Sequence, residues 1–267
     1  MRILLAASEA HPYAKTGGLA DMVAALGKSL ALAGHQVGIV LPLYRGLFER
    51  FALRRLEWRL EVPLDLRLVP GEVWLHEPVP GLTVYLVHAP EFFHDRAGLY
   101  GAGGHDFPDN AARFTLFAKA VAHLARYLPW RPEIVHVHDW QAGLVPLLVR
   151  HQAEHEGWSQ PPATILTIHN LAYRGIYPLD EWRHTNLPRD CLHPGGAEFH
   201  GLWSMLKAGL VFADRLTTVS PRYAREITTE AFGEGLDGVI RARQAVLTGI
   251  LNGVDYEEWN TTDNPWL

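Results

Sequence analysis

The sequence contains one cysteine, Cys191, among its 267 residues. A single thiol cannot form a disulfide within the chain, and such sparse cysteine usage fits a reducing compartment. Apolar runs are short, and none approaches the roughly 18 residues that a membrane-spanning helix needs. The N-terminus lacks the charged segment, the long apolar segment and the cleavage site of a secretory signal. We therefore expect a cytoplasmic protein with no membrane partner.

A surplus of positive charge is also missing. Lysine and arginine together number 24, aspartate and glutamate number 29, and the formal net charge is −5. Because nucleic-acid-binding domains usually carry a basic face, we expect no nucleic-acid partner. Apolar residues make up 48% of the chain, which is enough for a substantial core and argues against disorder.

Apolar runs that are typical of buried strands alternate with segments of helical spacing along most of the chain. The expected strands are residues 3–7, 36–41, 133–138, 164–168, 215–219 and 248–251, and the expected helices are residues 19–33, 107–126, 141–152, 202–212 and 221–230. The remaining segments are expected to form hairpin or edge structure (residues 50–90), a long surface loop (91–110) and a long connection (175–200). The alternation predicts an α/β fold with a doubly wound, mainly parallel sheet and helices on both faces.

The connection between the first expected strand and the first expected helix contains Lys15, Gly17 and Gly18. Glycine has no Cβ, so a Gly-Gly pair lets the backbone approach a ligand closely. The helix that follows directs free N–H groups and the positive end of its dipole into the loop, and Lys15 adds a mobile positive charge. These features are typical of an anion or nucleotide-sugar site, although a tight turn with an exposed lysine explains the same residues.

Polar residues follow two further expected strands. Asp139 comes directly after one of them, and His169 with Asn170 follows the next along the chain. Ligands of open parallel sheets bind outside the carboxyl ends of the strands, so we expect these residues and the glycine loop to meet in one crevice. Taken alone, a histidine after a strand is more often structural, and Trp140 fits core packing as well as it fits a site.

His136, His138 and Asp139 also raise the question of a metal. Histidines two residues apart on a strand point to the same face, so their spacing permits shared coordination. The chain has 15 histidines, however, which makes such pairs frequent by chance, and its one cysteine is a poor source of soft ligands. We expect no metal and interpret these histidines as buried or sugar-contacting.

Ordered motifs across nearly the whole chain resemble bacterial glycogen synthases and plant starch synthases. They are Ser8-Glu9, Pro12, KTGGLAD at 15–21, HVHDWQAG at 136–143, TIHNLAYRG at 167–175, LKAGL at 206–210, TVSPRYAREI at 218–227 and GILNGVD at 249–255. The resemblance implies the first Rossmann-like half of a GT-B glycosyltransferase. Residues 1–250 would form the N-terminal catalytic domain and residues 251–267 the start of an interdomain linker. The second Rossmann-like domain, which holds most nucleotide contacts in this family, is expected to be missing from the chain.

The resemblance also implies a reaction and a set of roles. A hexosyltransferase of this family moves glucose from ADP-glucose to the non-reducing end of an α-1,4-glucan such as glycogen, with retention and without a metal or other cofactor. His169 would contact the glucosyl ring near the reacting carbon, and Asp139 would act beside it as the second catalytic residue. The implied substrate-binding residues are Lys15, Gly17 and Gly18 for the departing diphosphate, Asn170 for sugar hydroxyls, and Tyr100 as a weaker candidate.

Several alternatives stay open at this point. The donor could be UDP-glucose, because base-reading residues would lie mostly in the missing half. The chain could also be a stand-alone, non-catalytic glucan-binding or interaction module, since half of a two-domain cleft cannot exclude water; alone, it is expected to be inactive. Asp21 fits a first-turn helix residue better than a ligand contact. Lys207 belongs to a matched motif but has no assignable role.

Overall fold

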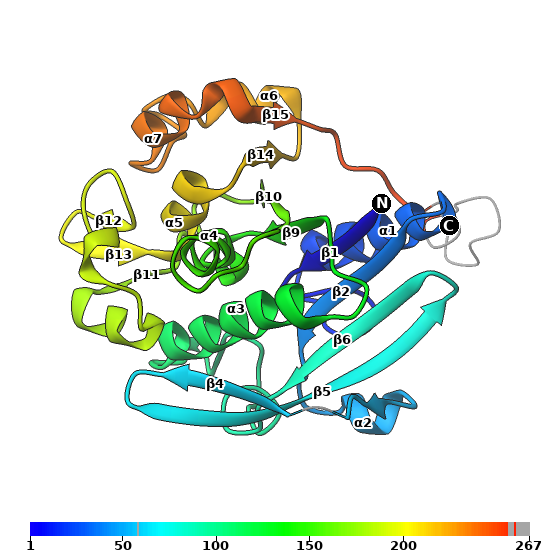
Figure 1. Ribbon diagram of the computed structural model, residues 1–267. Helices are drawn as coiled ribbons and strands as arrows, with labels where there is room; N and C mark the ends of the chain where they lie inside the picture. The colour runs from blue at the N-terminus through cyan, green and yellow to red at the C-terminus, as the bar shows by residue number, and fades with distance from the viewer. Residues whose placement is uncertain (58, 256–258, 260–267) are drawn as a thin grey trace.

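A ten-stranded, mostly parallel sheet forms the centre of the computed structural model, which describes residues 1–57, 59–255 and 259 (Figure 1). Along the sheet the strand order is β15-β14-β10-β9-β1-β2-β6-β5-β3, and β4 pairs with β5 beside this path. Strands from β15 to β6 run parallel to their neighbours. Strand β5 is antiparallel to β6, β3 and β4.

The central strands are β1 (Arg2–Ala6), β2 (Gln36–Pro42), β6 (Leu82–His88), β9 (Ile134–His138), β10 (Ala163–Ile168), β14 (Arg215–Thr218) and β15 (Leu247–Gly249). The antiparallel edge consists of β3 (Arg54–Arg55), β4 (Leu60–Leu64) and β5 (Arg67–Val79). Small additional sheets contain β7 (Gly101–Ala102) with β8 (His105–Asp106), and β11 (Ile176–Pro178), β13 (Leu202–Ser204) and β12 (Glu198–Phe199).

The helices are α1 (Gly18–Leu32), α2 (Leu47–Arg50), α3 (Asn110–Tyr127), α4 (Val145–His155), α5 (Met205–Phe212), α6 (Pro221–Glu226) and α7 (Asp237–Ala242). Short 3₁₀ turns occupy η1 (Trp140–Ala142), η2 (Leu179–Thr185), η3 (Arg189–Cys191) and η4 (Gln244–Val246). Of the helices in the described ranges, none is both long and apolar enough to span a bilayer.

Strands β1 and β2 are almost continuously apolar because helices cover both faces of the sheet. All residues of β1 after Arg2 and all residues of β2 after Gln36 are buried. Helix α1 packs on β2 and β6, while α3, α4 and α5 pack in sequence on the opposite face (Figure 1). The doubly wound, mainly parallel α/β fold expected from the sequence is confirmed.

The direction of the strand crossovers reverses between β1 and β9. Strand β1 leads through α1 to β2 on one side, whereas β9 leads through α4 to β10 on the other side. Because the two connections leave in opposite directions, a crevice forms outside the carboxyl ends of these adjacent strands. The glycine loop before α1 and the residues after β9 flank that crevice.

Two regions differ from the sequence-based expectations. The hairpin expected within residues 50–90 is present as β5 and β6, but β6 is an inner strand that also pairs in parallel with β2. Residues 91–110, expected to form a surface loop, bury the rings of Phe92 and Phe93. In both regions, apolar side chains between turn residues belong to the core because other elements cover them.

Several expected helices also have different limits. The helix expected over 141–152, for example, is α4 (Val145–His155), which follows the 3₁₀ turn η1 (Trp140–Ala142). The segment 202–212 begins as β13, and α5 starts only after Ser204, whose Oγ accepts the backbone N–H of Lys207 at 3.1 Å as an N-cap. The helix expected over 221–230 ends at Glu226. The linker expected at 251–267 falls mostly outside the described residues, so it stays a prediction.

Candidate functional site

A cavity of about 610 Å³ opens at the carboxyl ends of β1, β9 and β10. Its walls come from the start of α1, from the residues that follow β9 and β10, and from loops that reach across the crevice. The lining residues are Glu9, Thr16, Gly17, Gly18, Leu19, Tyr100, Asp106, Asp139, Trp140, Gln141, His169, Asn170, Tyr173, Val219 and Asn252. The crevice predicted from separate strand ends therefore exists and contains every expected site residue except Lys15.

Asp139 joins the ends of β9 and β10. Its Oδ1 accepts the backbone N–H of His169 at 2.7 Å and that of Asn170 at 3.4 Å. Burial raises the pKa of this carboxyl to about 7, although the two N–H donors act in the opposite direction. Its second oxygen, Oδ2, has no hydrogen-bond partner among the described residues and belongs to a side chain that borders the cavity. A ligand hydroxyl can therefore bind there.

The backbone of Asp139 is strained. Its φ of 55° and ψ of −169° lie in a region that glycine populates almost alone, at a cost of about 1–3 kcal/mol for other residues. Such conformations persist where the surroundings force them, and they gather at active sites and ligand clamps. The strain at Asp139 therefore agrees with a functional role for the turn after β9.

His169 borders the cavity, with its Nε2 atom 3.1 Å from Nδ1 of His138. Burial lowers the pKa of His169 to about 4 and that of His138 well below its usual range. Both rings are therefore neutral near pH 7. A neutral imidazole offers the cavity a single donor or a single acceptor and no positive charge.

The glycine loop leaves the start of α1 open. Gly17 is the N-cap residue, and no side chain of the described residues caps the helix. A Cβ at Gly17 or Gly18 would meet no atom of the described part of the chain within 4 Å, and neither residue has a positive φ. Packing and backbone conformation therefore do not require these glycines, whereas a ligand that approaches the uncapped N–H groups would.

Glu9 is a site residue that sequence reasoning does not assign, although it was part of a matched motif. Its buried carboxylate accepts the Thr16 backbone N–H, the Thr16 hydroxyl at 2.7 Å and the Tyr100 hydroxyl at 2.5 Å. The Tyr100 hydroxyl also lies 2.7 Å from Ser8 Oγ. Glu9 thus holds the glycine loop. A signal was available, since a Ser-Glu pair close behind a buried strand is unusual in a core.

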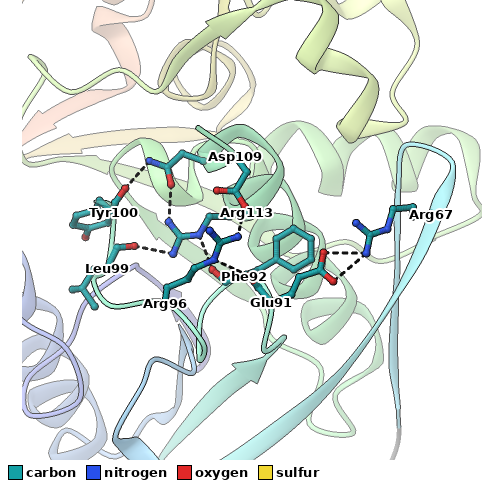
Figure 2. Close-up of polar contacts among 9 residues, drawn as sticks. Arg67, Glu91, Phe92, Arg96, Leu99, Tyr100, Asp109 and Arg113 are labelled. Carbon is teal, nitrogen blue, oxygen red and sulfur yellow. Dashed lines mark hydrogen bonds and ion pairs between the residues drawn. The ribbon is translucent and has the colours of Figure 1, made fainter. Parts of the chain in front are cut away.

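Arg113 on α3 holds the loop that carries Tyr100 into the cavity (Figure 2). Its guanidinium donates to the Phe92 carbonyl at 2.6 Å, to Asn110 Oδ1 at 2.6 Å and to the Leu99 carbonyl at 2.9 Å. Asn110 Nδ2 in turn donates to the Tyr100 carbonyl at 2.9 Å. The loop is therefore fixed from the core side, although its sequence is rich in glycine.

Lys15 does not line the cavity. Its Nζ pairs with Asp21 Oδ1 at 2.6 Å, and it lies 5.8 Å from the ring centroid of Trp259. Asp21 lies in the first turn of α1, as expected. Asn170 lines the cavity, but its Oδ1 already accepts the Ala172 backbone N–H at 3.0 Å. Its amide nitrogen is the group left for a ligand.

The structure assigns roles to two residues that the sequence left open. Trp140 borders the cavity and also packs edge-on against Phe114, with ring centroids 4.8 Å apart, so both interpretations apply. Lys207 is structural: its buried ammonium group donates to the carbonyls of Pro194, at 2.6 Å, and Glu198. It anchors the long connection before α5.

The histidines on β9 have other partners than a metal. His136 Nε2 lies 2.6 Å from Thr167 Oγ1, and burial lowers the pKa of His136 to about 4. Within residues 1–57 and 59–255, no cluster of three or more His, Cys, Asp or Glu side chains is arranged to hold a metal ion.

Residues 2–242 match the starch synthase catalytic domain family. The chain belongs to this family. The resemblance inferred from the ordered motifs is thereby confirmed, and the matched range includes the glycine loop, Asp139 and His169.

Among relatives, the chain is 45% identical over 269 residues to a glycogen synthase of Opitutus terrae, covering 100% of this chain and 56% of that protein. It is 46% identical over 268 residues to a glycogen synthase of Thioalkalivibrio sulfidiphilus, covering 97% and 53%. The catalytic domain of starch synthase IV from Arabidopsis thaliana, solved with ADP and acarbose, is similar with a TM-score of 0.87 at 31% identity, covering 100% of this chain and 54% of that one. The chain spans about half the length of the curated relatives it matches.

Proposed function

We propose that this chain supplies one domain of a glycogen synthase that transfers glucose from ADP-glucose to the non-reducing end of an α-1,4-glucan, with retention. One observation carries the proposal: a single cavity joins an uncapped helix N-terminus behind two glycines to a carboxylate and a neutral histidine. The first set of groups suits a diphosphate, and the second suits a sugar ring.

The glycine loop forms the proposed diphosphate end. Free N–H groups and the helix dipole at the start of α1 favour an anion. Lys15 lies beside this loop and is held by Asp21 in a pair that is 40% exposed at the lysine. Such exposed pairs contribute only about 0–1 kcal/mol, so Lys15 can turn to a phosphate oxygen. Because the leaving diphosphate gains charge as the glycosidic bond breaks, these donors stabilise the transition state.

Asp139 and His169 form the proposed glucosyl end. The free Oδ2 of Asp139 accepts a sugar hydroxyl, and its negative charge stabilises the positive charge that develops on the ring during transfer. His169, being neutral, donates or accepts one hydrogen bond without opposing that charge. Glu9 already accepts three hydrogen bonds from Thr16 and Tyr100, so we treat it as a support and assign no nucleophile.

The relatives support a partner domain and a donor. Proteins named glycogen synthase are about twice as long as this chain, so we propose that a second Rossmann-like domain of a GT-B enzyme faces the cavity across a cleft. That domain would exclude water and supply the remaining diphosphate and base contacts. ADP and acarbose in the starch synthase IV structure favour ADP-glucose over UDP-glucose and a glucan acceptor.

A chimera tests the proposal. Residues 1–249 of this chain are joined to the remaining half of the Opitutus terrae glycogen synthase, and transfer of labelled glucose to glycogen is measured with ADP-glucose and with UDP-glucose. We expect transfer from ADP-glucose, and a matched His169→Ala chimera should fold but transfer poorly. A folded chimera that transfers glucose from neither donor contradicts the proposal.

Co-sedimentation with glycogen tests the remaining alternative, that the chain is a non-catalytic glucan-binding module. The chain alone is expected to bind glycogen without transferring glucose, because half of the cleft cannot hold the donor. If the chain binds glycogen and the folded chimera is still inactive, the non-catalytic glucan-binding module replaces the enzyme as the better description.

A further inference from the structure

Three histidine rings form a row from the interior of the sheet to the cavity. His136 and His138 lie two residues apart on the same face of β9, and their ring centroids are 4.4 Å apart. The ring centroid of His138 lies 5.3 Å from that of His169. His138 is fully buried, whereas His169 borders the cavity. His138 therefore cannot touch a ligand, but it contacts a residue that can.

The hydrogen bond between His138 and His169 has a direction that the surroundings determine. Nδ1 of His138 and Nε2 of His169 lie 3.1 Å apart, so one of them carries the hydrogen and the other accepts it. The other nitrogen of His138, Nε2, is buried and has no hydrogen-bond partner among the described residues. If it carried the hydrogen, a buried N–H donor would be unpaired, which is rarer and costlier than a bare acceptor.

His136 does not change this assignment. Its Nε2 lies 2.6 Å from Thr167 Oγ1, which in turn lies 2.6 Å from Thr217 Oγ1. The ring of His136 is thus held by the threonines, and its contact with His138 is one of packing. The hydrogen of neutral His138 is therefore on Nδ1, where it has an acceptor.

We propose that His138 is a positioning residue that donates Nδ1–H to Nε2 of His169 and so holds His169 as its Nδ1–H tautomer. His169 then presents an N–H donor, and no basic nitrogen, to a ligand oxygen in the cavity. That the oxygen belongs to a sugar rests on the proposed function, whereas the tautomer does not. Neutral histidine in water prefers the Nε2–H form, so the protein reverses the ordinary preference.

Nitrogen NMR on the chain labelled with ¹⁵N-histidine measures the tautomer directly, because protonated and bare imidazole nitrogens resonate far apart. Spectra at pH 7.5, assigned with a His169→Gln variant, are expected to show His169 protonated at Nδ1 and bare at Nε2, with His138 protonated at Nδ1. A His169 ring protonated at Nε2 in the unmodified chain overturns the proposal, and this reading needs no variant at position 138.

Two substitutions sharpen the test. The amide nitrogen of asparagine occupies nearly the position of histidine Nδ1, so His138→Asn should keep His169 in the Nδ1–H form. His138→Asp replaces the donor with an acceptor at nearly the same position, so His169 should change to the Nε2–H form. An unchanged His169 spectrum in folded His138→Asp would show that His138 does not set the tautomer.

The same variants in the chimera connect the tautomer to transfer. His138→Asp should lower kcat about tenfold, as expected for losing the one aligned N–H donor of His169, whereas His138→Asn should keep most of the activity. Equal losses in both variants contradict the positioning role. If the spectra agree with the proposal while the unmodified chimera transfers no glucose, the positioning holds and only the proposed function fails.

Discussion

Arg113 and Asp139 are both buried charged residues, but Arg113 lies behind the Tyr100 loop whereas Asp139 lines the cavity. Arg113 is fully buried, and its guanidinium donates to three oxygens (Figure 2). The guanidinium also lies within 5.4 Å of the ring centroids of Phe93, Phe107 and Phe114. Asp139 has one oxygen bound by two backbone N–H groups and one without a partner among the described residues. Burial is common to both residues, but they differ in the number of satisfied polar atoms and in backbone strain.

The difference teaches how to distinguish a supporting charge from a reacting one. A buried charge whose hydrogen-bonding capacity is filled stabilises its neighbours, and removing it leaves their carbonyls unpaired. A buried charge with an open oxygen and a strained backbone is maintained at a cost to stability, which is typical of functional sites. Arg113 therefore serves the fold of the Tyr100 loop, and we expect Asp139 to serve chemistry.

The largest expected effect is on Asp139. In the chimera at pH 8, where Asp139 is mostly ionised, Asp139→Asn should lower kcat about 100- to 1000-fold, because the ring loses a nearby negative charge during transfer. The measurement is steady-state transfer from ADP-glucose. Asp180→Asn, which removes an exposed carboxylate far from the cavity lining, is the matched control and should leave the rate unchanged. A loss of less than threefold in kcat for Asp139→Asn would contradict a role of Asp139 in the chemistry.

Arg113→Met should lower the free energy of unfolding by about 3 kcal/mol, since it leaves buried carbonyls without their donor. Urea unfolding of the chain, followed by circular dichroism, measures the change. The control Arg150→Met removes an exposed i,i+4 pair with Glu154 and should cost about 0.5 kcal/mol or less. Equal destabilisation by the two variants would show that the Arg113 network carries no special stability.

The pH dependence of stability should separate the two residues further. The pKa of Asp139 is raised to about 7, so the folded chain retains a proton that the unfolded chain has released, and this group destabilises the fold as pH rises. Between pH 5 and pH 8, Asp139→Asn should therefore gain about 2 kcal/mol of stability relative to the unmodified chain. The cost of Arg113→Met should be the same at both values. Midpoints of urea unfolding, measured for both variants at pH 5 and pH 8, test these two expectations.

The buried histidines lower the stability of the unmodified chain as pH falls, whereas Asp139 lowers it as pH rises. The pKa values of His136 and His169 are lowered to about 4 and that of His138 is lowered well below its usual range, so the unfolded chain takes up protons first as pH falls below about 6.5. The loss of stability caused by three histidines exceeds the gain of stability from protonating the Asp139 carboxyl. The chain should therefore lose stability between pH 6.5 and pH 4, and a flat urea profile there would contradict the neutral histidine row.

Lys15 is an exposed charge and should show the smallest effect. Lys15→Ala in the chimera should weaken ADP-glucose use about tenfold in kcat/KM, through one lost charge-assisted hydrogen bond. Its effect on unfolding should stay within about 0.5 kcal/mol, because its pair with Asp21 is exposed. Transfer at the unmodified rate would remove Lys15 from the diphosphate site.

Much of the fold and part of the site could be predicted from the sequence. Strands such as β1 and β2 are mainly apolar runs, so their type and order were readable locally. The convergence of Gly17, Asp139 and His169 followed from the rule that parallel strands present their carboxyl ends together. Glu9 and Arg113 were not predicted, because a charged residue in a sequence gives no sign of which oxygen or donor it will meet.

The sequence by itself determined the order of the elements, the glycine loop and the family, because these depend on periodicity and on residues that are near neighbours in the chain. Only the tertiary structure decided that β6 lies inside the sheet, that Lys15 pairs with Asp21 outside the cavity, and that Asp139 Oδ2 has no partner among the described residues. Those outcomes depend on burial and on contacts in space that spacing along the chain does not fix. Hydrogen-bond satisfaction is a property of the folded neighbourhood, and no local pattern encodes it.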